Sequence, residues 1–304
     1  MDGILGRERA AAGASQHTKM ASLTTPISCA VPAEVLNVSA YLFVRVDDDE
    51  RLRALRDALH ARAAASGLKG TILLAPEGIN LFLAGPAPAL RGYLDDVRED
   101  PFFDGLYAPL QAKESWSTAQ PFGKLLVKIK REIIRMNRPS IRPTDGRAPA
   151  LPADTLARWL DACQDDEGRP VVMLDTRNAF ELEHGAFKDA IDWRIHKFSE
   201  FPEALKSHRH ELAGKTVVSY CTGGIRCEKA ALLMAEAGVE HVWQLEGGIL
   251  KYIESQQGRP GARHYLGSCF VFDERMALDG QLAPEQVLPA LAQPGALQSS
   301  VGSL

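Results

Sequence analysis

The chain has 304 residues, of which 45% are hydrophobic and 24% charged, the balance of a folded, soluble protein of about two domains. A net charge of −4 excludes binding to a polyanion by bulk charge, so any nucleic-acid surface must be a local basic patch. No run of about 18 apolar residues occurs, which excludes a membrane span. The charged start of the chain is not a secretory signal. Five irregularly spaced cysteines then indicate reduced thiols and a cytoplasmic protein.

Composition divides the chain into five predicted regions. They are a mobile leader (1–35), an N-terminal domain (36–137), a Pro-rich and Gly-containing linker (138–152), a second domain (153–258) and a C-terminal extension (259–304). In the N-terminal domain, apolar alternation predicts a strand over 37–46, two strands around a Pro-Glu-Gly turn over 68–85, and a fourth strand over 104–116. Helical patterns fill 47–67 and 86–100. This βαββαβ order predicts a ferredoxin-like fold, with one antiparallel sheet backed by two helices.

A basic segment over 121–142 follows, with seven basic residues and one acid. The candidate RNA-binding residues are Lys124, Lys128, Lys130, Arg131 and Arg135, because Lys and Arg neutralise phosphates. Strand alternation predicts the three lysines on one face and Leu125, Val127 and Ile129 toward the core. Phe122 or Trp116 would stack on an extruded base. The alternative is a solvated edge strand that its lysines protect from aggregation.

The second domain alternates helices and strands, which predicts a parallel α/β sheet. Helical patterns cover 154–162 and 225–238, and buried-strand patterns cover 169–176, 215–221 and 240–246. After residue 257 the pattern becomes irregular, with a short aromatic element over 265–278.

The loop from Cys221 to Arg226 joins a predicted strand to a predicted helix. Three features favour the Cys221 thiolate: the positive end of the helix dipole, N–H groups that Gly223 and Gly224 allow to converge on the sulfur, and the charge of Arg226. We therefore expect Cys221 to be ionised and open to an incoming reactant, in a loop completed by Thr222 and Ile225. The alternative is a buried structural cysteine.

The length of the Cys221 loop and the presence of Cys227 limit the reactions that Cys221 could carry out. Cysteine phosphatases place five residues between Cys and Arg, whereas four lie between Cys221 and Arg226, which disfavours a phosphate cradle. Cys227, in the first helical turn, would either capture an oxidised or persulfidated Cys221 as a disulfide or pack the helix on the sheet.

The Asp-Thr-Arg motif at 175–177, Phe180-Glu181 and the CTGGIR loop resemble rhodanese domains. The stretches 70–80, 121–134, 219–230, 244–254 and 267–277 further resemble the bacterial oxygen-dependent tRNA uridine-34 hydroxylases. The resemblance implies an acylphosphatase-like N-terminal domain, a rhodanese domain over 153–258, and an essential Cys221 that carries a persulfide in rhodanese domains. It also implies formation of 5-hydroxyuridine at the wobble position, with the tRNA anticodon arm as partner and molecular oxygen as co-substrate. Asp175 and Arg177 then either support catalysis or form a pair that supports the fold.

No metal site and no other cofactor can be identified from the sequence. It has no HxxxH or CxxC motif, its eight histidines are scattered, and no cysteine follows Cys269. Three hypotheses remain: a tRNA hydroxylase, a thiosulfate-type sulfurtransferase that acts through a Cys221 persulfide, and a non-catalytic binding module. The basic segment and the dedicated N-terminal domain favour the first, and the intact cysteine loop argues against the third. Oligomeric state is not predicted.

Overall fold

The computed structural model describes residues 34–257 and 264–284; Cys29, nearly all of the predicted leader and most of the predicted extension lie outside the described residues. The N-terminal domain contains a five-stranded sheet in the order β4-β1-β3-β2-β5. Its elements are β1 (Val35–Phe43), α1 (Asp49–Ala65), β2 (Lys69–Ala75), β3 (Gly78–Gly85), α2 (Ala87–Glu99), the 3₁₀ helix η1 (Pro101–Phe103), β4 (Gln111–Ser117) and β5 (Leu125–Ile129). β1 pairs antiparallel with β3 and with β4, and β2 pairs antiparallel with β3. β5 pairs with β2 in parallel. The predicted ferredoxin-like order is confirmed.

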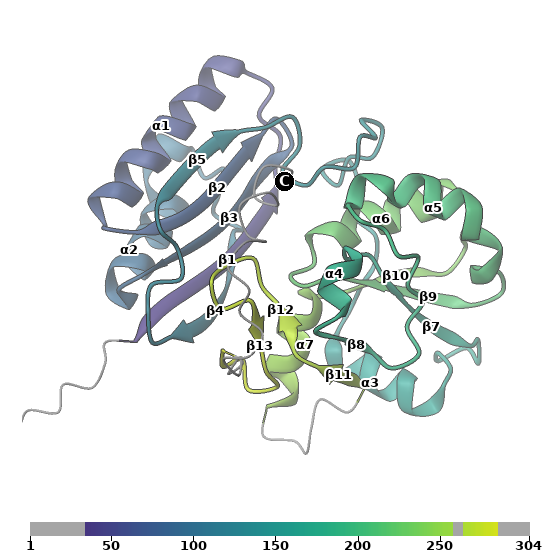
Figure 1. The fold of residues 1–304 in the computed structure, drawn as a ribbon. Coiled ribbons are helices and arrows are strands. Elements are labelled where there is room, and N and C mark those ends of the chain that lie inside the picture. Colours follow the sequence, from purple (N-terminus) through teal and green to yellow (C-terminus); the bar gives the residue numbers. More distant parts are fainter. Residues whose placement is uncertain (1–33, 258–263, 285–304) are drawn as a thin grey trace, which may run out of the picture. The chain divides into compact units, whose positions relative to one another are not determined.

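Alternation along β1 separates two faces of this sheet. Leu36, Val38 and Ala40 are buried in the core beneath α1 and α2, which cover one face (Figure 1). Ser39 and Tyr41 alternate with them and therefore lie on the opposite face. Lys113 of β4 pairs directly with Ser39, so its side chain shares that second face.

The basic segment contains β5, an edge strand of the sheet. Leu125 and Val127 pack against the core as predicted. The prediction for Ile129 is wrong, because its side chain is 37% exposed, and Lys130 is partly buried instead. Ile129 is the last residue of an edge strand, which has a neighbouring strand on one side only, and its side chain stays open to water. Lys130 follows it and remains attached to the sheet, because its N–H donates to the Leu74 carbonyl at 2.7 Å.

The second domain contains a parallel four-stranded sheet in the order β6-β10-β9-β7. Its elements are β6 (Ala150–Leu151), α3 (Ala153–Ala162), β7 (Val171–Asp175), α4 (Ala179–Leu182), β8 (Gly185–Phe187), η2 (Phe198–Glu200), α5 (Phe201–His208), η3 (Arg209–Leu212), β9 (Thr216–Tyr220), α6 (Ile225–Glu236), β10 (Val242–Leu245) and α7 (Gly248–Gln256). Three short strands follow: β11 (Tyr265–Gly267), β12 (Cys269–Phe270) and β13 (Ala277–Leu278). The predicted parallel α/β sheet is confirmed.

Helices cover both faces of the parallel sheet. Residues of α5 and α6 form one apolar cluster with Leu174 and Val217, and residues of α3 and α7 form another with Met173 and Val218. Cys221 follows the last residue of β9, at the carboxyl end of the sheet, where α/β folds place their reacting groups. The described residues of both domains belong to one compact unit. No helix within 34–257 or 264–284 has the length and apolar character needed to cross a membrane.

Candidate active site

The loop between β9 and α6 curls around the sulfur of Cys221. Gly224 has a φ of +103°, a conformation that favours glycine, and its N–H donates to the Cys221 Sγ at 3.1 Å. The first turn of α7 is hydrogen-bonded to the loop: the N–H groups of Ile249 and Leu250 donate to the carbonyls of Cys221 and Thr222 at 2.9 and 3.1 Å. The loop therefore has a fixed shape with an N–H group directed at the sulfur.

Cys221 and Cys227 form a close, asymmetric pair. The Cys227 thiol donates to the Cys221 Sγ, with 3.3 Å between the two sulfur atoms. Burial opposes ionisation of Cys221, but the Cys227 thiol, the Arg226 charge and the N–H groups of these two residues outweigh it and lower the pKa of Cys221 well below that of a free thiol. Burial and the neighbouring sulfur raise the pKa of Cys227. The site thus favours the thiolate at Cys221 and the protonated thiol at Cys227.

Arg226 is held by a buried carboxylate, Glu181, on α4. Its two terminal nitrogens donate to the Glu181 oxygens at 2.5 and 2.7 Å, and Thr222 Oγ1 donates to the same carboxylate at 3.2 Å. Glu181 is fully buried and Arg226 is 4% exposed. Burial opposes ionisation of Glu181, but Arg226 outweighs it and keeps the pKa of this carboxyl below its usual range. Glu181 entered the sequence analysis only as part of the rhodanese resemblance, with no role assigned, and its pairing with Arg226 follows from the fold.

Asp175 and Arg177 form a second buried ion pair near the end of β7. Arg177 Nε and Nη2 donate to the Asp175 oxygens at 3.0 and 2.7 Å, and Nη2 also donates to the Gly185 carbonyl at 2.7 Å. Both side chains are fully buried. The pair joins β7 to β8, the arrangement expected of a pair that supports the fold.

Gly248 is a residue whose importance the sequence did not reveal. It has a φ of +67°, and a Cβ at this position would lie 2.4 Å from the carbonyl oxygen of Cys221. We expect Gly248→Ala to destabilise the protein by about 2 kcal/mol or more, because both strain and a clash with backbone oppose the side chain. Urea unfolding measures the loss. Gly223→Ala is the matched control, since its Cβ would meet only Ser39 Oγ at 3.8 Å. Equal stability of the two variants would contradict the close approach.

The expectation that Cys221 is open to an incoming reactant is wrong for this structure, because its exposed fraction is 0%. The second face of the N-terminal sheet covers the loop. A Cβ on Gly224 would lie 2.8 Å from the Tyr41 hydroxyl, and one on Gly223 would lie 3.8 Å from Ser39 Oγ. Ile225 completes the contact in a cluster with Ala75 and Ile133. The Cys221 loop was predicted from the sequence, but the contact between domains that buries its cysteine was not.

Two adjacent residues of α6 make the polar part of this contact. The Tyr41 hydroxyl donates to Glu228 at 2.8 Å, and Arg147 also donates to that carboxylate. Lys229, 1% exposed, binds Glu77 and Glu132 with N–O distances of 2.7 and 2.8 Å. The helix that begins at the cysteine loop therefore also carries the ionic contacts to the N-terminal domain.

Lys113 brings a positive charge from the N-terminal sheet to the same region. Its ammonium lies 5.2 Å from the centre of the Tyr41 ring, and it forms no ion pair with a carboxylate of the described ranges. Burial lowers the pKa of Lys113, and the negative charge of Cys221 partly opposes that effect. Lys113 was not predicted as a site residue, because its position near Cys221 follows from the pairing of β4 with β1, which sets Lys113 opposite Ser39.

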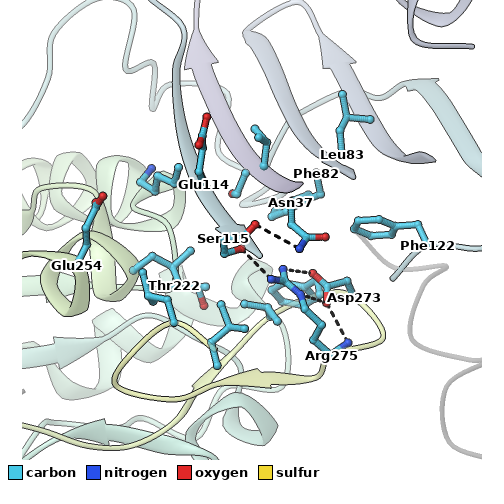
Figure 2. A pocket seen from close by; sticks show the side chains of 18 residues that line it. Asn37, Phe82, Leu83, Glu114, Ser115, Phe122, Thr222, Glu254, Asp273 and Arg275 are labelled. Carbon is cyan, nitrogen blue, oxygen red and sulfur yellow. Dashed lines mark hydrogen bonds and ion pairs between the residues drawn. The ribbon is translucent and has the colours of Figure 1, made fainter. Parts of the chain in front are cut away.

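A cavity of about 30 Å³ lies beside the loop, between the N-terminal sheet and the segment around Asp273 and Arg275 (Figure 2). Phe122 and Thr222 both line it. This volume holds about one water molecule, so the closed site has no room for a nucleobase. Trp116 lines a neighbouring hollow of about 460 Å³.

The five candidate RNA-binding residues lie on the edge strand β5 or in the chain on either side of it. Lys124, Lys128, Arg131 and Arg135 are exposed. Glu132, the one acid of the basic segment, is occupied by Lys229 and by the N–H groups of Met136 and Asn137. Within the part of the chain that the structure describes, none of the five basic side chains forms an ion pair. No acidic side chain of the described protein therefore neutralises their charges.

The described ranges contain no group of three His, Cys, Asp or Glu side chains placed to hold a metal ion.

Two family models match the two domains in turn. The UPF0176 acylphosphatase like domain matches residues 35–133 and the rhodanese-like domain matches residues 153–255. A tRNA uridine(34) hydroxylase of Delftia acidovorans is 60% identical over 251 residues, which cover 83% of this chain and 91% of the relative. This chain belongs to the tRNA uridine(34) hydroxylase family. The family members of Variovorax paradoxus and Bordetella avium are 60% and 59% identical over 250 residues each, which cover 82% of this chain and 91% and 99% of those relatives.

Membership of the tRNA uridine(34) hydroxylase family confirms the resemblance and the fold class predicted from the sequence. The roles of Cys221, its loop, Cys227 and the basic residues in this family member stay predictions.

Proposed function

We propose that this protein hydroxylates uridine 34 of tRNA at carbon 5, with molecular oxygen as co-substrate and Cys221 as the essential residue. The observation that carries the proposal is the 60% identity to relatives named tRNA uridine(34) hydroxylase over most of both chains. The product, 5-hydroxyuridine, and the use of oxygen are what the family resemblance implies. The thiolate of Cys221 supports the proposal because a thiolate is a strong nucleophile at neutral pH.

The thiolate has two routes to the chemistry. It either adds to carbon 6 of the uracil ring and so activates carbon 5, or it carries a reactive oxygen or sulfur species to carbon 5. Both routes need the base in contact with Cys221, which the second face of the N-terminal sheet now covers. We propose that the anticodon arm binds with the sheet moved away from the loop, and that uridine 34 leaves its stack to enter. Phe122 and Trp116 are the aromatic candidates to stack on it.

Mass spectrometry of nucleosides from the anticodon wobble position tests the proposal. Cells that lack the gene are expected to lose 5-hydroxyuridine at position 34, and a plasmid copy should restore it. Unchanged 5-hydroxyuridine in the deletion strain would reject the hydroxylase assignment. Purified protein should form the nucleoside in air and fail to form it under nitrogen.

The sulfurtransferase alternative is less well supported. A Cys221 persulfide would lie beside the Cys227 thiol, which is 3.3 Å from Cys221 and well placed to attack it. A stable sulfur carrier gains nothing from such a neighbour. Transfer of sulfur from thiosulfate to cyanide at rates typical of rhodaneses, without tRNA modification, would favour this alternative.

The charge of the basic segment gives a prediction about tRNA binding. Reversing both Lys124 and Lys128 to Glu is expected to weaken binding and to reduce the slope of log K against log salt concentration by about two, because each lysine that contacts a phosphate contributes about one. Filter binding at several salt concentrations measures it. Lys188→Glu with Lys206→Glu is the matched control, with the same charge change at exposed positions of the second domain. Equal slopes for the two double variants would support the edge-strand alternative.

A further inference from the structure

Cys227 has a property that the proposed reaction leaves unexplained. Hydroxylation by dioxygen places one oxygen atom in the product and releases the other as water, which consumes two electrons beyond those of the C–H bond. A pair of thiols supplies two electrons when it forms a disulfide. The question is which thiols of the chain are placed to do so.

The Cys221–Cys227 pair is built for that chemistry. The two sulfur atoms are 3.3 Å apart, both side chains are fully buried, and the thiol of one donates to the sulfur of the other. Cys269 is also buried, but within the described residues its thiol donates to the Phe270 carbonyl and not to a sulfur, and burial raises its pKa to about 12. Cys163 is exposed. Among the described cysteines, only Cys221 and Cys227 form a hydrogen bond with another cysteine, and they form it with each other.

Little movement is needed to join the two sulfur atoms. Cys227 lies in the first turn of α6, between Arg226, which Glu181 holds, and Glu228, which Tyr41 holds. Because the Cys221 sulfur is only 3.3 Å away, a small rotation of its side chain brings the two sulfurs to the bonding distance of about 2.0 Å. Once the sheet again covers the loop, burial of both sulfur atoms keeps water away from any oxidised form of Cys221 until Cys227 reacts with it.

We propose that Cys221 and Cys227 are the electron donors of the reaction and leave each turnover as a disulfide; this rests on the proposed hydroxylase function. The balance is one uridine, one dioxygen, the Cys221 thiolate, the Cys227 thiol and one proton from solvent giving one 5-hydroxyuridine, one water and one disulfide. The O–O, C5–H and Cys227 S–H bonds break, and the C5–O, S–S and new O–H bonds form. Carbon 5 and the two sulfurs are oxidised while dioxygen is reduced, and the thiol proton, the solvent proton and the proton from carbon 5 end on the new hydroxyl group and the water. A cellular dithiol then reduces the disulfide by exchange.

A single-turnover experiment tests this proposal. The protein is reduced, freed of reductant without air, mixed with excess unmodified tRNA and exposed to air. We expect up to one 5-hydroxyuridine per chain, and one Cys221–Cys227 disulfide for each, measured by nucleoside and peptide mass spectrometry. Product with all thiols intact would overturn the proposal.

Cys227→Ser separates electron supply from positioning, because the serine hydroxyl still donates a hydrogen bond to Cys221. We expect no product above that of Cys221→Ser, whereas Cys163→Ser should behave as the parent protein. Product from Cys227→Ser at the parent level would overturn the proposal. If the parent protein makes no 5-hydroxyuridine even with dithiothreitol in repeated turnovers, the hydroxylase function itself is rejected, and this inference with it.

Discussion

Cys221→Ser is expected to reduce formation of 5-hydroxyuridine by at least about a thousandfold while tRNA affinity stays within about twofold. Serine keeps the size of the side chain but is not ionised at neutral pH, so the nucleophile is lost. The candidate phosphate contacts lie on β5 and on either side of it, outside the Cys221 loop, which is why binding should survive. Nucleoside mass spectrometry measures the product, and filter binding measures the affinity.

Cys163→Ser is the control for this variant, since Cys163 is an exposed cysteine of the same domain and should be replaceable without effect. Wild-type levels of the modified nucleoside in cells with only Cys221→Ser would show that the nucleophile is wrongly assigned.

The dependence of activity on pH follows from the pKa of Cys221. Because the site lowers the pKa of Cys221, the thiolate persists at neutral pH, and activity should fall only as the pH drops through that lowered value.

The fold and the centre of the site were predictable from local patterns. Alternation on β1, helical spacing in α1 and the buried-strand run of β9 are each encoded in a few consecutive residues. The loop at Cys221 combines a strand end, two glycines and an arginine within six residues, so its shape is also local.

The rest of the site depends on contacts between distant segments. Glu181 meets Arg226 across 45 residues, and Tyr41 meets Glu228 across 187. Neither pairing leaves a trace in the spacing of the sequence. The burial of Cys221 depends on which face of the N-terminal sheet meets the loop, and the sequence shows that the sheet has two faces without showing what covers the second. The need for glycine at position 248 could not be predicted either, because its close approach to Cys221 arises from the packing of α7.

Glu181→Gln is expected to lower the free energy of unfolding by about 3–5 kcal/mol, a large share of the 5–15 kcal/mol that is usual for a domain. The cause is the charge of Arg226, which stays buried after its carboxylate is removed. Thr222 would also lose its charged acceptor, so the loop around Cys221 should loosen. Urea unfolding measures the loss, and a result within about 0.5 kcal/mol of the parent would mean that Arg226 finds another partner or leaves the interior.

The double variant Glu181→Gln with Arg226→Met separates a lost attraction from an unpaired buried charge. If the unpaired charge is what destabilises Glu181→Gln, removing Arg226 as well should recover much of the loss, and the coupling between the two positions should be large.

The pH dependence of the stability follows from the lowered pKa of Glu181. The stabilisation by this pair is fully present above the pKa of the unfolded carboxyl and is lost as the pH falls through the lower pKa of the folded protein. The parent should therefore lose stability in acid that the double variant does not lose, and equal acid sensitivity of the two would show that other carboxylates dominate. Because Arg226 also lowers the pKa of Cys221, the double variant should regain stability without regaining activity at neutral pH.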